Sequence, residues 1–297
     1  MWSKNMASRN PTVAGQFYPG SERECRLEIE YCLKNRPIQE KLPEKIIGGI
    51  VPHAGWVFSG DLAGMVFSAI EMANKKVDTF VIFGATHSNF GSSAAVYDKG
   101  SWITPMGEIE IDEELAAAIM KKSKSAKANQ NAHKYEHSIE VQIPLIQYIF
   151  KDAKIVPILT SPAEYAIMLG MEVGECIKKA ADKKVVCIGS TDLTHYGPRY
   201  GFDPKGKGQA GIDWAKNVND RIFIDLAVEM KAEQILIESM VNQNACGPGA
   251  AAATISAAKA LGKTKGVLLA HTHSNEVMEA RYGRTSEESV GYAAIVY

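Results

Sequence analysis

The sequence predicts an α/β protein in which a mixed or parallel central sheet is flanked by helices. Short apolar runs rich in valine and isoleucine alternate along the chain with longer segments whose apolar residues recur with a helical period. Polar stretches at 121–136 and 196–211 are interpreted as loops, because strand and helix patterns resume on either side of them. We therefore expect one domain that spans residues 1–297.

Six apolar runs are predicted to be strands, at residues 45–51, 79–85, 154–160, 184–190, 266–272 and 290–297. Eight segments with helical periodicity are predicted to be helices, at residues 21–35, 60–75, 112–122, 137–150, 163–181, 213–230, 232–242 and 248–261. In the segment 60–75 apolar residues recur every three or four positions, which is the pattern of a helix that packs one side against a core.

The composition excludes several classes of function. A net charge of −1 on 297 residues argues against a general nucleic-acid binder, which needs a basic surface to neutralise phosphates. No apolar run reaches the roughly 18 residues that span a bilayer. The first eleven residues, MWSKNMASRNP, lack the apolar core of a signal peptide. We expect a cytoplasmic protein without nucleic-acid or membrane partners.

The five cysteines are an odd number and lack the spacing of a disulfide framework. Four of them lie in predicted helices or strands, where a free cysteine is usually a small buried apolar residue. The fifth, Cys246, lies in a glycine-rich turn that leads into the alanine-rich segment 248–261. A helix N-terminus lowers the pKa of a thiol, so Cys246 is a candidate nucleophile or metal ligand. The alternative is a turn that only requires a small residue.

Three predicted strands end in polar signatures that contain histidine: VPHAG with His53, FGATHS with His87, and STDLTH with Asp192 and His195. Because ligands of open α/β sheets bind at the carboxyl ends of strands, we expect these side chains to meet at one sheet edge. A single histidine in such a place is commonly a hydrogen-bonded loop residue. Three in equivalent places favour a shared metal site, since imidazole is the commonest protein ligand of transition metals.

The segment YEHSIEVQIPLIQYIF places Glu136, His137 and Glu140 at the start of an apolar helix. A carboxylate beside a metal-bound histidine would orient that histidine, but acidic residues also suit the first turn of a helix through its dipole. The sequence leaves both interpretations open. His133, in a loop rich in lysine and asparagine, is predicted to be solvated.

Together these motifs resemble the Memo family, which is found in archaea, bacteria and eukaryotes. The match extends over nearly the whole chain, in the family's order, through RNPTVAGQFYPG, VPHAGWVFSG, FGATHS, EHSIEVQIPL, STDLTHYG, ACGPGA and SVGYAAIVY. The family fold resembles that of the class III non-haem iron extradiol dioxygenases, which cleave catechol rings. The resemblance therefore implies an α/β sheet with its site at one edge.

The resemblance also implies roles for the matching residues. Family members bind iron or copper through the histidine of PHAG, the histidine of G-x-x-H and the cysteine of CG, here His53, His87 and Cys246. The aspartate and histidine of S-T-D-L-T-H, here Asp192 and His195, line the same pocket. In the dioxygenases the third ligand resembles a carboxylate, so the thiol in its place argues against ring cleavage.

The resemblance implies partners as well. Prokaryotic members are associated with a radical-SAM enzyme and a third partner protein. Eukaryotic members are described as redox proteins that handle copper or iron, or as adaptors that recognise phosphotyrosine-containing receptor tails. The short loops of this chain resemble those of a prokaryotic member, so we do not expect the protein to act as an adaptor in kinase signalling.

Three functional hypotheses follow. In the first, His53, His87 and Cys246 hold Fe(II) or Cu, with Zn(II) as the alternative, for redox or oxygenase-like chemistry on a small molecule. His195, oriented by Asp192, would then act as general acid and base. In the second, the same cleft at the strand edge binds a peptide or a metal without turnover. In the third, Cys246 is the nucleophile of a hydrolase, which would need only one histidine.

Overall fold

Four parallel strands form the centre of the structure, a computed structural model that describes residues 8–88, 91 and 94–297. Their order in the sheet is β2, β9, β3 and β8, with the bounds Gly48–Val51, Val185–Ser190, Thr79–Gly84 and Lys154–Leu159. All of their residues are buried except Lys154. Strands covered on both faces need no polar alternation, which explains why the sequence shows them as continuous apolar runs. The segment MWSKNMASRNP lies mostly outside the described residues.

The remaining strands extend this centre into a mixed sheet, which among the described residues has nine strands. The order is β10-β12-β2-β9-β3-β8-β4-β7, and β11 pairs antiparallel with β12. A separate three-stranded sheet has the order β1-β5-β6. The bounds of these strands are β1 Ser8–Arg9, β4 Ala94–Val96, β5 Ser101–Thr104, β6 Gly107–Glu110, β7 Ala126–Ala128, β10 His195–Tyr196, β11 Val267–His273 and β12 Ser289–Val296. The expected α/β class with a mixed central sheet is confirmed.

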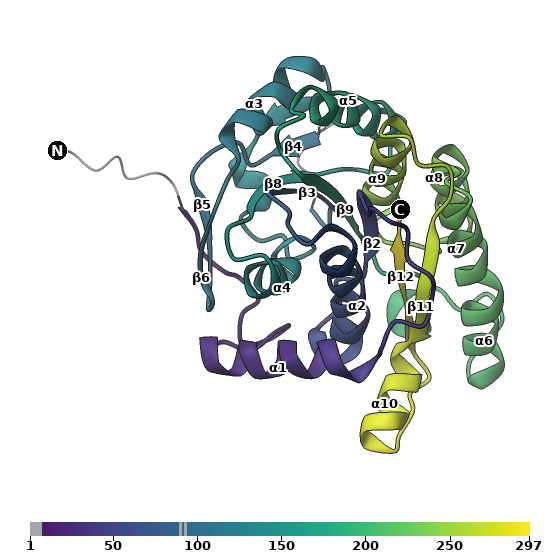
Figure 1. The fold of residues 1–297 in the computed structure, drawn as a ribbon. Helices are drawn as coiled ribbons and strands as arrows, with labels where there is room; N and C mark the ends of the chain where they lie inside the picture. Colours follow the sequence, from purple (N-terminus) through teal and green to yellow (C-terminus); the bar gives the residue numbers. More distant parts are fainter. Residues whose placement is uncertain (1–7, 89–90, 92–93) are drawn as a thin grey trace.

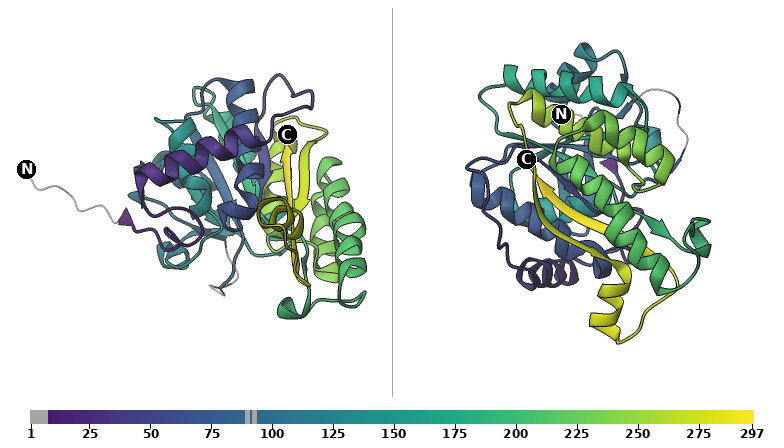
Figure 2. Two further views of the ribbon diagram at one scale, coloured as in Figure 1. Left: turned by 90° about the horizontal axis from the view of Figure 1, so that it is seen from below. Right: turned by 90° about the vertical axis from the view of Figure 1, so that its right-hand side faces the viewer.

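Helices cover both faces of the large sheet, as Figures 1 and 2 show. The α-helices of the described residues are α1 Glu22–Asn35, α2 Trp56–Asn74, α3 Glu113–Lys122, α4 Ile143–Ile149, α5 Tyr165–Lys179, α6 Gln209–Trp214, α7 Asp220–Val228, α8 Ala232–Asn242, α9 Pro248–Ala260 and α10 Ser274–Tyr282. A π-helical turn joins α6 to α7, and short 3-10 turns complete the set at Gln130–His133, Glu140–Gln142 and Pro198–Tyr200.

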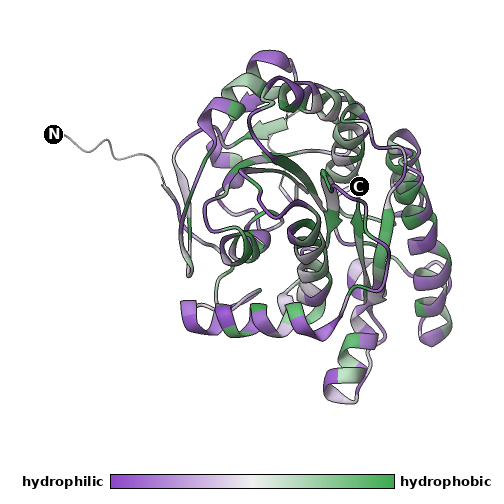
Figure 3. Cartoon of the chain, viewed as in Figure 1, coloured by the Kyte–Doolittle hydropathy of each residue, from purple (hydrophilic) through white to green (hydrophobic). Residues whose placement is uncertain are grey.

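The two helical layers bury alternate residues of the same strands. Along β3, Phe80 and Ile82 pack against the layer of α1, α2 and α4, whereas Val81 and Phe83 pack against the layer of α3, α5 and α9. This is the alternation of a pleated strand. Figure 3 shows the result: apolar residues concentrate on the strands and inner helix faces, and polar residues lie outside. The core therefore holds the strand ends, and the loops beyond them, in fixed places.

Two helices begin where a tertiary contact or a proline allows, and not where the apolar pattern begins. α2 begins at Trp56 and not at residue 60, because the Phe17 carbonyl accepts the Trp56 N–H that the first turn would leave unpaired. Within the predicted helix 137–150, a 3-10 turn begins only at Glu140, and α4 follows it with Pro144 in its first turn. Proline favours that position and disfavours helix before it.

Close packing in two places depends on glycine. A Cβ on Gly170 of α5 would lie 2.1 Å from the Ala253 carbonyl oxygen of α9, so this helix pair requires hydrogen there. A Cβ on Gly84, the last residue of β3, would lie 2.5 Å from the Ile139 side chain and 2.8 Å from Ser138 Oγ. Gly84 therefore lets the segment around residue 138 approach the carboxyl end of the sheet.

Among the described residues, no helix combines the length and the apolar character that a bilayer crossing requires. The cytoplasmic location stays a prediction.

Candidate metal centre

The carboxyl ends of three neighbouring parallel strands carry predicted site residues. His53 lies two residues beyond β2, His87 three residues beyond β3, and Asp192 two residues beyond β9. Because β2, β9 and β3 are adjacent in the sheet, these residues meet at one edge, as the sequence predicts. The ring centroids of His53 and His87 are 5.3 Å apart.

His53 is buried and its tautomer follows from its neighbours. The Ser190 hydroxyl donates its hydrogen to the Ser138 carbonyl at 2.6 Å, so its oxygen accepts from His53 Nδ1 at 3.1 Å. Nδ1 therefore carries the proton, and Nε2 keeps its lone pair. Burial, with His87 as a second cause, lowers the pKa of His53 to about 3, so the ring is neutral at neutral pH.

His87 is held by a carboxylate. Glu136 Oε1 accepts from His87 Nδ1 at 2.9 Å, and Oε2 accepts the main-chain N–H of His87 at 2.8 Å. This leaves His87 Nε2 free to bind a ligand, and a carboxylate in this place is the usual partner of a metal-bound histidine. Burial alone would lower the pKa of His87 and raise that of Glu136. Burial is the largest single cause, but the hydrogen bond and the attraction of opposite charges together outweigh it, so the pKa of His87 is raised and that of Glu136 is lowered.

His137 is the third imidazole at this edge. Its ring stacks on His87 at 4.5 Å and 23°, and it meets the edge of His53 at 5.4 Å and 89°. Burial and the two neighbouring imidazoles lower the pKa of His137 to about 4. One nitrogen from each of His53, His87 and His137 lies within 4.8 Å of the other two. Three imidazoles at this spacing could hold a metal ion.

Cys246 borders the same group. Its Sγ lies 3.1 Å from His53 Nε2 and accepts the main-chain N–H of Asp192 at 3.3 Å. It stands directly before Gly247, the N-cap of α9, as the sequence predicts. Burial and the Asp192 charge nevertheless raise the pKa of the thiol, opposite to the lowering expected from the helix dipole alone. In the chain without a metal the thiol is therefore protonated and donates to His53.

Asp192 and His195 are close to the group, but they do not pair as expected. Asp192 Oδ1 accepts the main-chain N–H groups of His53 at 2.6 Å and Ala54 at 3.2 Å, so it fixes the loop that carries His53. His195 Nδ1 donates to the Leu193 carbonyl at 3.0 Å, and its ring meets the edge of Tyr200 at 5.1 Å. The main chain and Tyr200 therefore orient His195.

The sequence leaves the role of His137 open and predicts the wrong environment for His133. His137 is on no strand end, so the rule that singled out His53 and His87 could not select it; its only signal was the neighbouring Glu136. His133 is fully buried and bonded through Nε2 to the Ala95 carbonyl at 2.9 Å, so the prediction that it is solvated is wrong. The polar composition of the loop suggested exposure to solvent, although the His133 side chain is buried.

Fold and site together define a class: an α/β protein whose strand-end histidines could hold a metal ion. The chain matches the family described as "Memo-like protein" over residues 9–296. It is 39% identical to a "MEMO1 family protein" of Thermococcus onnurineus over 97% of this chain and 99% of that relative. A relative in Pyrococcus abyssi is 39% identical over 97% of this chain and 98% of that relative. A relative in Methanopyrus kandleri is 36% identical over 97% of this chain and 98% of that relative. The chain belongs to the Memo family.

Proposed function

We propose that the protein binds one transition-metal ion at the carboxyl edge of its sheet, with His53 and His87 as ligands. The observation that carries this proposal is the group of three imidazole nitrogens that lie within 4.8 Å of one another. The Nδ1 atoms of His53 and His87 are committed to Ser190 and Glu136, so each ring offers Nε2. Neutral imidazole with Nδ1–H bonded to an oxygen is the form that binds metals.

We propose Cys246 as the third ligand and His137 as the alternative. The family resemblance implies the cysteine, and its Sγ is already a neighbour of His53 Nε2 at 3.1 Å. The spacing of nitrogens favours His137, which needs no deprotonation to bind. If Cys246 is the third ligand, folded Cys246→Ser protein should bind the metal much more weakly. If His137 is the third ligand, folded His137→Ala protein should do so instead. Anaerobic metal titration of both variants separates the two donor sets.

The donors suit Fe(II) or Cu, with Zn(II) as the alternative, because imidazole binds all three and thiolate favours Cu(I) and Zn(II). A bound iron or copper ion would supply redox or oxygenase-like chemistry. The chain itself would supply His195 as general acid and base: the Leu193 carbonyl holds Nδ1, so Nε2 is the atom that takes or gives a proton. Asp192 supports the site by fixing the His53 loop.

The molecule that reaches this edge is proposed to be a small molecule or a peptide. His87 has a side chain that is 39% exposed, so the group is accessible from solvent. We further propose the partners implied by the family resemblance, a radical-SAM enzyme and a third protein, and a cytoplasmic location.

One contact favours a second candidate function. The Cys246 thiol and the His53 imidazole, at 3.1 Å, have the spacing of a nucleophile and its base in a cysteine hydrolase. The raised pKa of the thiol and the lowered pKa of His53 oppose that proton transfer. This electrostatic mismatch favours metal binding over hydrolysis.

An oxygen-consumption assay on the metal-loaded chain distinguishes turnover from binding. Anaerobic purification followed by metal analysis establishes the occupant, and oxygen uptake with candidate reductants and small molecules establishes redox activity. A metal that binds stoichiometrically without any oxygen uptake or electron transfer would favour the non-catalytic binding protein.

A further inference from the structure

A buried ion pair connects the N-terminal segment to the metal centre. Arg9 Nη1 donates to Glu140 Oε2 at 2.7 Å, and the two side chains are 4% and 0% exposed. Such a pair is rarely more stabilising than apolar side chains of similar size, because both charges lose their water. The other contacts of Arg9 and Glu140 therefore indicate what the pair does.

Arg9 fixes the main chain that carries Glu136. Its Nε donates to the His133 carbonyl at 2.7 Å, and its Nη2 donates to the Glu136 carbonyl at 2.8 Å. The guanidinium also stacks over the Trp102 ring, 4.1 Å from its centroid. Because the guanidinium is planar and its donors are rigidly spaced, it holds both carbonyls in register. Glu136, whose carbonyl Arg9 holds, also carries the carboxylate that orients His87.

Glu140 fixes the segment that packs against His137. It accepts the main-chain N–H of Val13 at 2.9 Å and the Tyr18 hydroxyl at 3.0 Å. The Val13 carbonyl accepts the N–H of Phe17 at 2.9 Å, so the turn held by Glu140 carries Phe17. The half-buried Phe17 ring lies 4.8 Å from the His137 ring.

We propose that Arg9 and Glu140 are positioning residues of the metal centre. Arg9 sets the place of Glu136 and thereby the direction of His87 Nε2, while Glu140 seats Phe17 against His137. Neither residue is one of the proposed metal ligands. This inference rests on the proposed metal-binding function, and it adds the N-terminal segment to the parts of the chain that shape the site.

The test uses Arg9→Lys and Glu140→Gln in the full chain, with Co(II) added anaerobically as a spectroscopic probe. Lysine keeps the charge facing Glu140 but cannot bond the two carbonyls and the carboxylate together, and glutamine keeps the shape of Glu140 but loses its charge. We expect Co(II) affinity to fall about tenfold or more in each, with a changed visible absorption band, by analogy with other residues that orient metal ligands.

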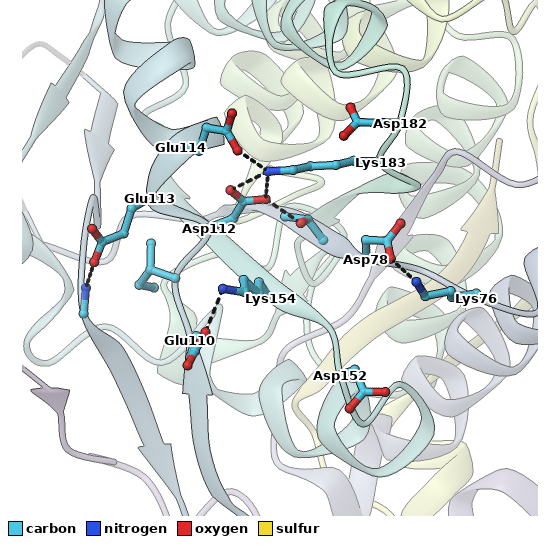
Figure 4. Close-up of a pocket in the computed structure, with 13 residues that line it drawn as sticks. Lys76, Asp78, Glu110, Asp112, Glu113, Glu114, Asp152, Lys154, Asp182 and Lys183 are labelled. Atoms are coloured by element: carbon cyan, nitrogen blue, oxygen red, sulfur yellow. Dashed lines mark hydrogen bonds and ion pairs between the residues drawn. The ribbon is translucent and has the colours of Figure 1, made fainter.

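Asp112→Asn is the matched control. Asp112 is also a buried carboxylate in an ion pair: it bonds Lys183, the Thr79 hydroxyl and the Leu115 N–H. It lies at the amino ends of the strands, beside a pocket of about 770 Å³ that Figure 4 shows. Asp112→Asn should lower the free energy of unfolding while leaving Co(II) affinity and spectrum as in the wild type.

A second readout needs no metal. ¹H–¹⁵N NMR of the imidazoles in the metal-free protein reports whether His87 Nδ1 keeps its proton bonded to Glu136, and we expect Arg9→Lys to weaken that signal. Wild-type Co(II) affinity, spectrum and His87 signal in both folded variants would overturn the inference. Should Glu140→Gln fail to fold, Arg9→Lys decides. A wild type that binds no Co(II) while Arg9→Lys still alters His87 would overturn the proposed function alone.

Discussion

Hydrogen bonds to Nδ1 determine what the two strand-end histidines can do. Ser190 and Glu136 both accept from an Nδ1–H, one as a neutral hydroxyl and one as a carboxylate. The difference in charge separates the two rings: burial lowers the pKa of His53 to about 3, whereas Glu136 outweighs burial and raises the pKa of His87. Of the two strand-end imidazoles, His53 therefore resists protonation and His87 accepts a proton readily.

This difference predicts how metal affinity depends on pH. A metal competes with protons for imidazole, and His87 protonates first as the pH falls because its pKa is raised. His53 and His137, with pKa values of about 3 and 4, remain neutral. Below the His87 pKa, competition with this proton should lower affinity by about a further tenfold per pH unit, in addition to the proton that Cys246 releases if its thiolate is the third ligand. Titrations at several pH values check this; affinity that is constant down to about pH 5 would contradict the assigned role of His87.

The five thiols predict a selective modification. Cys246 is partly exposed, whereas Cys25, Cys32, Cys176 and Cys187 are buried. Mild alkylation of the metal-free protein followed by peptide mapping should label Cys246 first, and slowly at neutral pH because burial raises its pKa. A bound metal should protect it if it is the third ligand. Faster labelling of a buried cysteine would count against this order of accessibility.

At the scale of elements, the sequence predicts the strands of the central sheet well. Their Val and Ile runs are buried on both faces, so no polar residue breaks the pattern. The short strands Ala94–Val96, Ala126–Ala128 and His195–Tyr196 are too short to show a period of two. Helix α10 follows β11 without a turn residue between them, so the sequence carries no signal that marks this boundary.

The candidate site likewise contains residues that the sequence predicts and residues that it does not. His53, His87 and Asp192 could be predicted because each follows a recognisable strand, and parallel strands bring their carboxyl ends together. His137 reaches the site on the irregular segment between two 3-10 turns. The position of this segment depends on Arg9, Glu140 and Gly84, contacts that local sequence does not encode. His133 and His137 lie four residues apart, yet one is buried beneath the loop and the other faces the site.

Gly84→Ala tests how closely β3 and the turn must approach. The added Cβ would lie 2.5 Å from the Ile139 side chain, so the segment after His137 must move. We expect a loss of about 1–3 kcal/mol in the free energy of unfolding, together with weaker metal binding. Gly64→Ala in α2 is the control, since its Cβ would meet ordinary contacts at 3.5 Å, and alanine favours a helix. Equal effects of the two substitutions on metal affinity would refute the packing argument.

At the scale of the whole molecule, buried neutral histidines predict sensitivity to acid. Burial lowers the pKa of His133 to about 3, whereas the unfolded chain has the usual value near 6.5. Between these values the unfolded state binds a proton that the native state excludes, so stability is complete above about pH 6.5 and falls as the pH falls. The expected slope is about 1.4 kcal/mol per pH unit for each such histidine.

Urea unfolding at about pH 7.5 and 5.5 measures this loss. His133→Gln should flatten the slope, because glutamine can donate to the Ala95 carbonyl without titrating. An unfolding free energy that is unchanged at the lower pH would show that these rings accept protons while folded.

The central claim is that the strand-end histidines hold one metal ion, and anaerobic calorimetric titration with Fe(II) and Cu(I) tests it most directly. The wild type should bind about one ion per chain, and His53→Ala and His87→Ala should lose that binding while keeping the wild-type circular dichroism. His271→Gln, whose parent side chain pairs with Asp220 outside the group, should bind like the wild type. Unchanged affinity in folded His53→Ala protein would contradict the account and reduce His53 to a hydrogen-bonded loop residue.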